Sequence, residues 1–301
     1  MRSVNFQKNE NREVILSILL PAYNYPLGIQ KILDYLKLPD DSELKSKVEI
    51  IIFDNSIDAC VESQIETTLK KNKHIVYKNY SYKTVACKNW NKLIDKARGA
   101  YYILMHHDEF PLTKNFISKA IEEIEEHKDI DVIIMDCIVM NKSTGSLRPH
   151  VPSFIRKKVF ENFPRWLFIR NAIGPTATLI VKRSLHPGFD CRLEWLIDVD
   201  EYYSIRKRAK SWIFSNNLLV GSYTDRDESI TSSLKGEIKN IRRDELKYLY
   251  KKHRLRENRF YLCMVIILWV GMRVITRPYW YIMNRIGKYP VPTEVVKKAF
   301  K

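Results

Sequence analysis

Short, nearly continuous apolar runs alternate along the chain with segments whose apolar residues recur at helical spacing. The apolar runs cover residues 14–20, 48–53, 75–77, 101–105, 131–140 and 177–181. Helical spacing covers residues 27–38, 61–69, 90–97, 117–127 and 195–209. Short continuous apolar runs are typical of buried strands in parallel sheets. Their alternation with helices predicts an α/β fold, in which helices cover both faces of a mostly parallel sheet.

The pattern becomes irregular after residue 140. Residues 141–172 mix Pro, Arg and aromatic residues without a clear period, which predicts mobile segments on the surface. From about residue 231 the pattern changes again, to long basic helices. The net charge of +16 is concentrated there, because 17 Lys and Arg accompany only five acids from Lys235 onward. Such a basic tail is typical of contact with an anionic surface, either lipid headgroups or nucleic acid.

Acidic residues follow the predicted strands, where open α/β sheets bind their ligands. Asp54 follows the second apolar run, and a His-His-Asp-Glu cluster at residues 106–109 follows a later one. A third group begins the last helical segment: Asp198, Asp200 and Glu201. Acids gathered at one sheet edge would form a negative cleft, which suits a divalent metal bound to a diphosphate. A strand that runs into a solvated acidic turn is the alternative interpretation.

Several common catalytic and redox signatures are absent from the sequence. No predicted strand is followed by GxGxxG or GxxxxGK, and no GxSxG nucleophile elbow occurs. The five cysteines are scattered, odd in number and without CxxC spacing. This argues against a disulfide framework and a cysteine zinc site, and it favours a reducing compartment. Residues 1–13 are polar, so we expect no export signal.

Four short motifs occur in order along the first 110 residues. They are Leu19-Leu20-Pro21-Ala22-Tyr23-Asn24, Phe53-Asp54-Asn55-Ser56, Lys88-Asn89-Trp90-Asn91 and His106-His107-Asp108-Glu109. In this order and spacing they resemble the family 2 glycosyltransferases of the GT-A fold, and the resemblance continues to about residue 230. It implies a GT-A catalytic domain over residues 1–230, with a nucleotide-sugar part at about 14–110 and an acceptor part at about 111–230. Residues 231–301 would then form a basic, aromatic-rich helical extension.

The resemblance assigns roles in binding the donor. The loop after the first strand would wall the nucleotide base, with Tyr23 supplying a flat face. Asp54 would accept hydrogen bonds from the base or ribose, and capping of the next helix is its alternative role. Lys88 would neutralise the diphosphate. The implied donor-binding residues are Pro21, Ala22, Tyr23, Asn24, Asp54, Asn55, Lys88, His106 and His107.

The resemblance also assigns a metal ligand and a catalytic base. In the cluster at residues 106–109, which resembles the family's DxD motif, His106 occupies the first Asp position and Asp108 the second. Asp108 is therefore expected to bind a divalent metal cofactor, Mn²⁺ or Mg²⁺. Asp198 aligns with the Asp that acts as general base on the acceptor hydroxyl, with Asp200 and Glu201 as alternatives. The implied acceptor or secondary residues are Glu109, Gly174, Pro175, Trp195, Asp200 and Glu201.

The function that these roles imply is an inverting glycosyltransferase. It would move a sugar from a nucleotide sugar to a hydroxyl of a lipid-linked saccharide in bacterial surface polysaccharide synthesis. The expected donor is a UDP-sugar. One alternative is a nucleotidyltransferase that makes sugar nucleotides. Another is a non-catalytic basic protein on a degenerate GT-A fold, whose tail binds membrane or nucleic acid. The three acidic clusters argue against a pure polyanion binder, so we expect no nucleic-acid partner.

The basic tail contains an uncharged, mostly apolar stretch at residues 260–272. Its thirteen residues fall short of the ~20 that span a bilayer. Apolar and aromatic residues then alternate with Arg273, Arg277 and Arg285, which favours a helix lying among lipid headgroups. Packing of this helix on the catalytic domain is the alternative. We therefore expect a cytoplasmic protein, peripheral on the inner face of the cell membrane and bound to its anionic surface.

Overall fold

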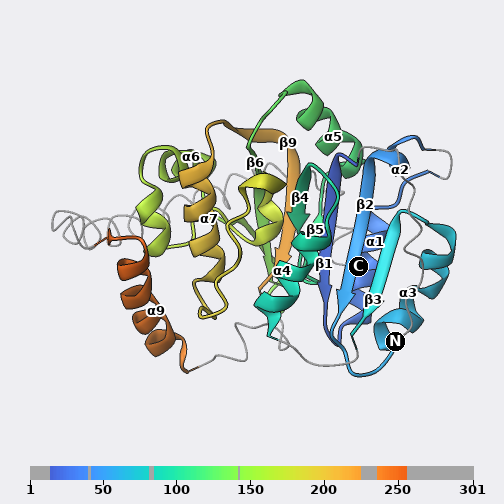
Figure 1. The fold of residues 1–301 in the computed structure, drawn as a ribbon, viewed down its shortest axis with the longest axis horizontal. Coiled ribbons are helices and arrows are strands. Elements are labelled where there is room, and N and C mark those ends of the chain that lie inside the picture. The colour runs from blue at the N-terminus through green and yellow to red at the C-terminus, as the bar shows by residue number, and fades with distance from the viewer. Residues whose placement is uncertain (1–13, 40–41, 81–84, 142, 225–235, 256–301) are drawn as a thin grey trace.

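The computed structural model describes residues 14–39, 42–80, 85–141, 143–224 and 236–255. Within these residues, one mixed sheet of nine strands has the order β3-β2-β1-β4-β8-β6-β9-β5, with β7 paired to β6 (Figure 1). The strands are β1 (Leu16–Ala22), β2 (Val48–Asp54), β3 (Ile75–Asn79), β4 (Tyr101–Leu104), β5 (Glu109–Pro111), β6 (Val132–Asn141), β7 (Ser146–Pro149), β8 (Leu179–Lys182) and β9 (Trp212–Tyr223). β3, β2, β1 and β4 run parallel, as do β6 and β9, whereas β8, β5 and β7 are antiparallel to their neighbours.

Helices cover both faces of this sheet. They are α1 (Pro26–Tyr35), α2 (Leu44–Lys47), α3 (Cys60–Lys71), α4 (Ala86–Lys96), α5 (Phe116–Glu126), α6 (Ser153–Asn162), α7 (Ile197–Arg208) and α9 (Ile238–Lys252), with 3-10 turns η1 (Pro164–Phe168), η2 (Thr176–Thr178) and η3 (Arg183–Leu185). One core packs α1, α3 and α5 against strand residues such as Ile18 and Ile50. The other packs α4, α6, α7 and α9 against residues such as Leu19 and Ile51. Because successive strand residues point to opposite faces, two covered faces require unbroken apolar strands.

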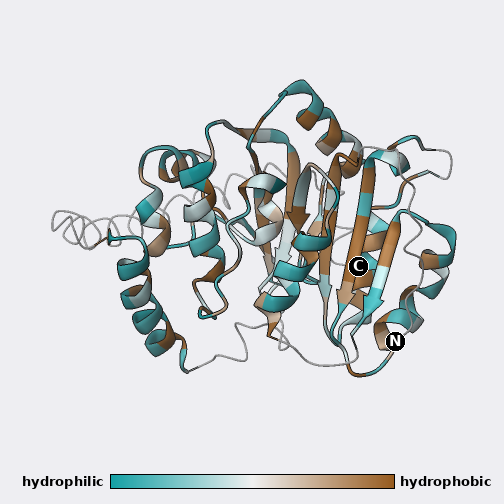
Figure 2. Ribbon diagram, viewed as in Figure 1, coloured by the Kyte–Doolittle hydropathy of each residue, from teal (hydrophilic) through white to brown (hydrophobic). Residues whose placement is uncertain are grey.

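The six predicted strands and the five predicted helices are present, so the α/β fold is confirmed. The hydropathy colouring in Figure 2 reflects the same division, with brown strands in the centre and mainly teal outer helices such as α9. Strand β9 escaped prediction because polar residues at 215–217 interrupt its apolar pattern beside a register shift in its pairing with β6. The antiparallel strands make the sheet more mixed than its sequence pattern indicates.

The prediction of mobile surface segments at residues 141–172 is wrong. This region forms β7, α6 and η1, and it buries Val159, Phe160, Leu167 and Phe168 in the second core. Its apolar side chains are irregularly spaced because short elements of different period each contribute only a few of them. Aromatic residues without a period can therefore still mark a packed core.

Helix α9 lies in the described part of the basic extension, and it packs against the α/β body. Leu249 is fully buried in the second core, and Leu255 just beyond the helix is 2% exposed. No helix in the described part of the chain has the length and apolar character needed to cross a bilayer. The predicted headgroup helix at residues 260–272 lies outside the described residues.

Candidate active site

The turns after β1 and β2 lie side by side, because the strands are parallel and Ala22 pairs with Asp54. Asp54 is fully buried, and its carboxylate accepts hydrogen bonds from the amide and hydroxyl of Ser56 (2.9 and 2.6 Å) and from the Tyr77 hydroxyl (2.7 Å). The Ser56 hydroxyl oxygen accepts a hydrogen bond from the Asn24 amide at 2.7 Å. The Asp54 carboxylate therefore organises both turns.

The predicted base-binding loop lies at this sheet edge. Pro21 and Ala22 end β1 and are buried, whereas Tyr23, the next residue, is 38% exposed. Helix α3 has Ala59 at its N-cap and no side-chain cap, so the alternative role of Asp54 as a helix cap is wrong. Lys88 is exposed in the first turn of α4, the helix that buries Trp90 in the second core.

Three polar atoms buried near this edge lack a hydrogen-bond partner among the described residues: Asn55 Oδ1, Asn89 Oδ1 and His106 Nε2. The Asn89 side chain donates to the Phe53 carbonyl at 3.1 Å, so α4 holds this amide against the end of β2. Buried polar groups in native proteins normally have partners, since leaving them unpaired is costly. These unpaired atoms favour a polar ligand at the sheet edge.

The half-buried His106 and the buried Glu109 form a pair after the end of β4. The His106 Nδ1 atom lies 3.2 Å from Glu109 Oε1, and the His106 amide donates to Glu109 Oε2 at 3.0 Å. Glu109 also accepts a hydrogen bond from the Ala177 amide at 3.2 Å, which joins this turn to η2. The His106 ring packs 4.7 Å from the Trp90 ring, whereas the His107 ring packs 5.5 Å from Tyr25.

Asp108 lies in the turn between His106 and Glu109. The described residues contain no group of three or more metal-binding side chains. A carboxylate in such a position fits a cation that takes its remaining ligands from phosphate oxygens and water, as Mg²⁺ commonly does. The Asp108 carboxylate therefore fits a metal that arrives bound to a diphosphate. It does not fit a metal whose ligands all come from the protein.

Asp198 begins α7 and is held by Asn171. The Asn171 Nδ2 group donates to Asp198 Oδ2 at 2.6 Å and to the Gly174 carbonyl at 2.8 Å, while its Oδ1 accepts from the Gly174 amide at 2.9 Å. Gly174 has φ of +123°, a conformation that favours glycine, and Pro175 follows it into η2. Burial raises the pKa of Asp198 to about 7, although the Val199 amide and Asn171 oppose this shift.

The other two acids of α7 face elsewhere. Asp200 is buried and pairs with Lys252 Nζ and His253 Nε2, each at 2.6 Å. Glu201 accepts a hydrogen bond from the Tyr102 hydroxyl at 3.0 Å and lies 3.2 Å from His186. Burial raises the pKa of Glu201, against the hydrogen bonds from these partners. The helix thus directs its three carboxylates toward three different surroundings.

Electrostatics link the strand turn to α7. Burial by itself would lower the pKa of His106, but the negative charge of Glu109, reinforced by Asp108 and Asp198, raises it overall. The same group of charges therefore includes the predicted metal ligand and the predicted base. Of the predicted acceptor-side acids in α7, Asp198 therefore lies near the turn at residues 106–109, whereas Asp200 and Glu201 lie in other surroundings.

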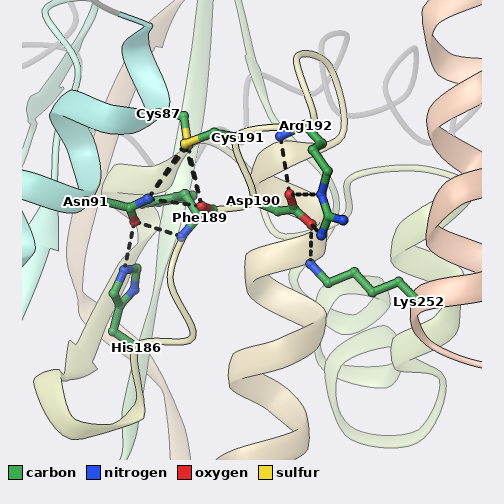
Figure 3. The surroundings of a disulfide bond; sticks show 8 residues. All are labelled: Cys87, Asn91, His186, Phe189, Asp190, Cys191, Arg192 and Lys252. Atoms are coloured by element: carbon green, nitrogen blue, oxygen red, sulfur yellow. Dashed lines mark hydrogen bonds and ion pairs between the residues drawn. A yellow bond between two sulfur atoms is a disulfide. The ribbon is translucent and has the colours of Figure 1, made fainter.

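Cys87 and Cys191 form a disulfide (Figure 3), so the prediction against disulfides from the scattered cysteine pattern is wrong for this pair. The two residues lie 104 positions apart, at the start of α4 and in the loop before α7, so no local spacing could reveal the pair. Asn91 reinforces the link by donating to the Phe189 carbonyl (3.0 Å) and accepting from the Phe189 amide (2.8 Å). The bond joins the start of α4 to the loop that leads into α7.

Sequence reasoning missed several residues that build the site. Asn89 and Trp90 belong to a motif that assigns them no role. The same holds for Thr176 in the motif Gly174-Pro175-Thr176-Ala177, although its hydroxyl lies 3.2 Å from His106 Nδ1. Short motifs contain no signal for Asn171, because it reaches Asp198 across 27 positions of chain. Trp195 is half-buried, and its amide contacts Glu245 of α9, another residue that only the fold brings near.

Solved structures of similar fold include two sugar-nucleotide complexes. The S. aureus TarS 1-349 complex with UDP-GlcNAc has a TM-score of 0.58 at 18% identity, covering 73% of this chain and 61% of that one. The mannosyltransferase PcManGT from Pyrobaculum calidifontis, in complex with GDP-Man and Mn²⁺, has a TM-score of 0.54 at 12% identity, covering 95% and 80%. The chain thus spans about three fifths of that TarS fragment. At these identities the likeness establishes the fold.

No curated protein matches the chain. The family described as glycosyl transferase family 2 matches residues 17–186, more than half of the sequence. This range begins within β1 and contains the donor-side turns, Asp108 and the segment around Gly174. The chain therefore belongs to glycosyl transferase family 2.

Proposed function

We propose that this chain is an inverting glycosyltransferase, which moves one sugar from a nucleotide-sugar donor to a hydroxyl group of a saccharide acceptor. The observation that carries the proposal is the Asp198 carboxyl group, which Asn171 orients beside the charged turn at His106. Membership of the glycosyl transferase family supports it. The nucleotide-sugar ligands of the two similar structures support the class of donor.

Asp198 is the general base of this mechanism. It takes the proton of the acceptor hydroxyl while that oxygen attacks the anomeric carbon of the donor. The bond between this carbon and the diphosphate breaks, and the nucleoside diphosphate leaves with the bonding electrons. Because one displacement occurs without a second nucleophile, the configuration at the anomeric carbon inverts. A pKa near 7 makes Asp198 a stronger base than an ordinary aspartate.

The donor lies across the turns at the ends of β1, β2 and β4. Tyr23 covers the base, and Asn55 and Asn89 use their unpaired oxygens to accept hydrogen bonds from the nucleoside. Lys88 faces the diphosphate. Asp108 holds a divalent cation, Mn²⁺ or Mg²⁺, which neutralises the leaving diphosphate when bound.

The acceptor is a lipid-linked saccharide of bacterial surface polysaccharide synthesis, and the donor is first of all a UDP-sugar. UDP and UDP-GlcNAc bound to S. aureus TarS support the choice of UDP. The surplus of basic residues from Lys235 onward supports a position on the anionic inner face of the cell membrane. There the enzyme would meet a cytoplasmic donor and a membrane-bound acceptor together.

A donor panel tests the proposal. Purified protein is incubated with UDP-GlcNAc, other UDP-sugars or GDP-mannose, with Mn²⁺ or after chelation. Thermal stability and nucleoside diphosphate release are measured, with water taking the place of the acceptor hydroxyl and receiving the sugar. We expect one donor to raise the melting temperature and release its nucleotide in the presence of metal, because a ligand of the native state stabilises it. Stabilisation and release by none of the nucleotide sugars would contradict the proposal.

A further inference from the structure

Helix α9 contributes a buried carboxylate to the segment that leads into α7. Glu245 is only 7% exposed, although it lies on a strongly basic helix. Its two oxygens accept hydrogen bonds from three consecutive backbone amides: Glu194, Trp195 (3.1 and 3.2 Å) and Leu196 (2.8 Å). Hydrogen bonds from backbone amides to a carboxylate are among the stronger ones in proteins.

The same helix also binds the two residues that flank this segment, Asp190 and Asp200. Lys252 reaches Asp190 at 2.9 Å and Asp200 at 2.6 Å, and the Tyr248 hydroxyl donates to Asp190 at 2.6 Å. Hydrogen bonds from Arg192, Tyr248 and Lys252 outweigh burial and lower the pKa of Asp190. One face of α9 therefore fixes residues 190 to 200 at three places, and Asp198 lies between the second and third.

We propose that Glu245 is a positioning residue for Asp198. Leu196 is the N-cap of α7, which has no side-chain cap of its own. By holding the amides of residues 194–196, Glu245 sets where the helix begins and in which direction its first turn presents Asp198. Asn171 then orients the carboxyl group itself. The inference rests on the proposed catalytic role of Asp198.

The matched pair Glu245→Gln and Asp244→Asn tests this inference. Gln keeps the size of Glu245 but offers one acceptor oxygen and turns an amide donor toward backbone donors. Asp244 is the neighbouring acid, yet it is 61% exposed and pairs only with surface bases, so its Asn variant controls for loss of one negative charge on α9. Hydrogen exchange of residues 190–199 and release of nucleotide from UDP-GlcNAc or GDP-mannose are measured for each.

We expect Glu245→Gln to speed amide exchange at residues 194–196 about tenfold or more, since three hydrogen bonds weaken. It should lower kcat for nucleotide release by about tenfold or more, because misplacement near 1 Å can cost 10²-fold. KM for the donor should stay within about twofold, and Asp244→Asn should match wild type throughout. Misfolding of part of the sample would lower the apparent kcat without changing KM, but it would speed amide exchange throughout residues 190–199. A positioning role predicts faster exchange centred on residues 194–196, so the exchange pattern separates positioning from misfolding.

Unchanged exchange in Glu245→Gln, or faster exchange with kcat near that of wild type, would overturn the inference. If the proposed function is wrong, the wild-type protein will release nucleotide from neither donor, and this result distinguishes that failure from a failure of the inference. In that case the exchange measurement still decides whether Glu245 holds the start of α7.

Discussion

Asp198 is a carboxyl group that the fold keeps in an electrostatically unfavourable place. Its ordinary pKa of 3.8 rises to about 7 through burial, so near neutral pH it exchanges protons readily. Asn171 and the Val199 amide stabilise the ionised form, and Glu201 destabilises it. Perturbed carboxyl groups of this kind gather at functional sites. The residue therefore leads to predictions on both rate and stability.

The rate of nucleotide release should rise with pH and level off above about 7, since only ionised Asp198 can accept the acceptor's proton. Asp198→Asn should lower turnover by about 10²- to 10⁴-fold at pH 8 and leave donor affinity within a few-fold. A pH–rate profile of the wild type and the variant checks this. Normal turnover in Asp198→Asn, with loss in Asp200→Asn or Glu201→Gln, would assign the base elsewhere.

The free energy of unfolding should fall as the pH rises, because of the same carboxyl group. A folded-state pKa above the unfolded value contributes stability that is full below pH 3.8 and is lost as pH rises to about 7. Asp198→Asn removes this loss, so its free energy of unfolding should exceed that of the wild type at pH 8, by at most about 4 kcal/mol. Urea unfolding at pH 5 and pH 8 measures it. Asp129→Asn, on a side chain 94% exposed, is the control.

Asp108 should affect metal-dependent donor binding rather than folding. Asp108→Ala removes the proposed metal ligand, so titration with UDP should give weaker binding in Mn²⁺ and nearly equal binding after chelation. The expected loss is about 10-fold or more, as for other changes around bound metals. Equal stimulation of UDP binding by Mn²⁺ in variant and wild type would contradict the assignment.

At the scale of the elements, strands buried on both faces were the most readable from sequence. β1, β2 and β4 are mostly apolar because both sheet faces are covered, and the buried polar residues Ser17 and Glu49 bond to each other. The turns after these strands carry the proposed donor-binding residues. α6 and β9 were missed because irregular aromatic spacing and an internal polar stretch hide their period. The residues of the candidate site likewise divide into those that local sequence reveals and those that it does not. Turn residues were visible as motifs, whereas Asn171, Glu245 and the disulfide depend on contacts distant in sequence.

The disulfide is the cross-link between elements whose loss should be measurable. Cys191→Ser should lower the free energy of unfolding by about 2–4 kcal/mol, because Cys87–Cys191 closes a long loop in the unfolded chain. Addition of a reducing agent should affect wild type in the same way and leave Cys191→Ser unchanged. Cys60→Ser, at a free cysteine, provides the control. Equal melting temperatures for all three proteins would show that the link adds no stability.

The whole molecule combines a nearly balanced body with a basic C-terminal region. α9 belongs to that region in sequence, but it forms part of the packed body. A test of membrane binding should therefore keep α9. Removal of residues 256–301 should abolish sedimentation with vesicles containing phosphatidylglycerol at low salt, because it removes basic and aromatic residues together. Phosphatidylcholine vesicles are the control, and undiminished binding by the folded truncation would contradict the proposal.

The position of α9 also has a consequence for biosynthesis. A ribosome releases the chain from its N-terminus, so the donor-side turns, which end near residue 109, emerge long before Glu245 and Lys252. The residues of the proposed donor site are therefore synthesised while the segment before α7 still lacks its carboxylate partner. Under the proposed role of Glu245, catalysis begins only when the last described helix has left the exit tunnel. Synthesis itself would then set the order in which donor binding and turnover are acquired.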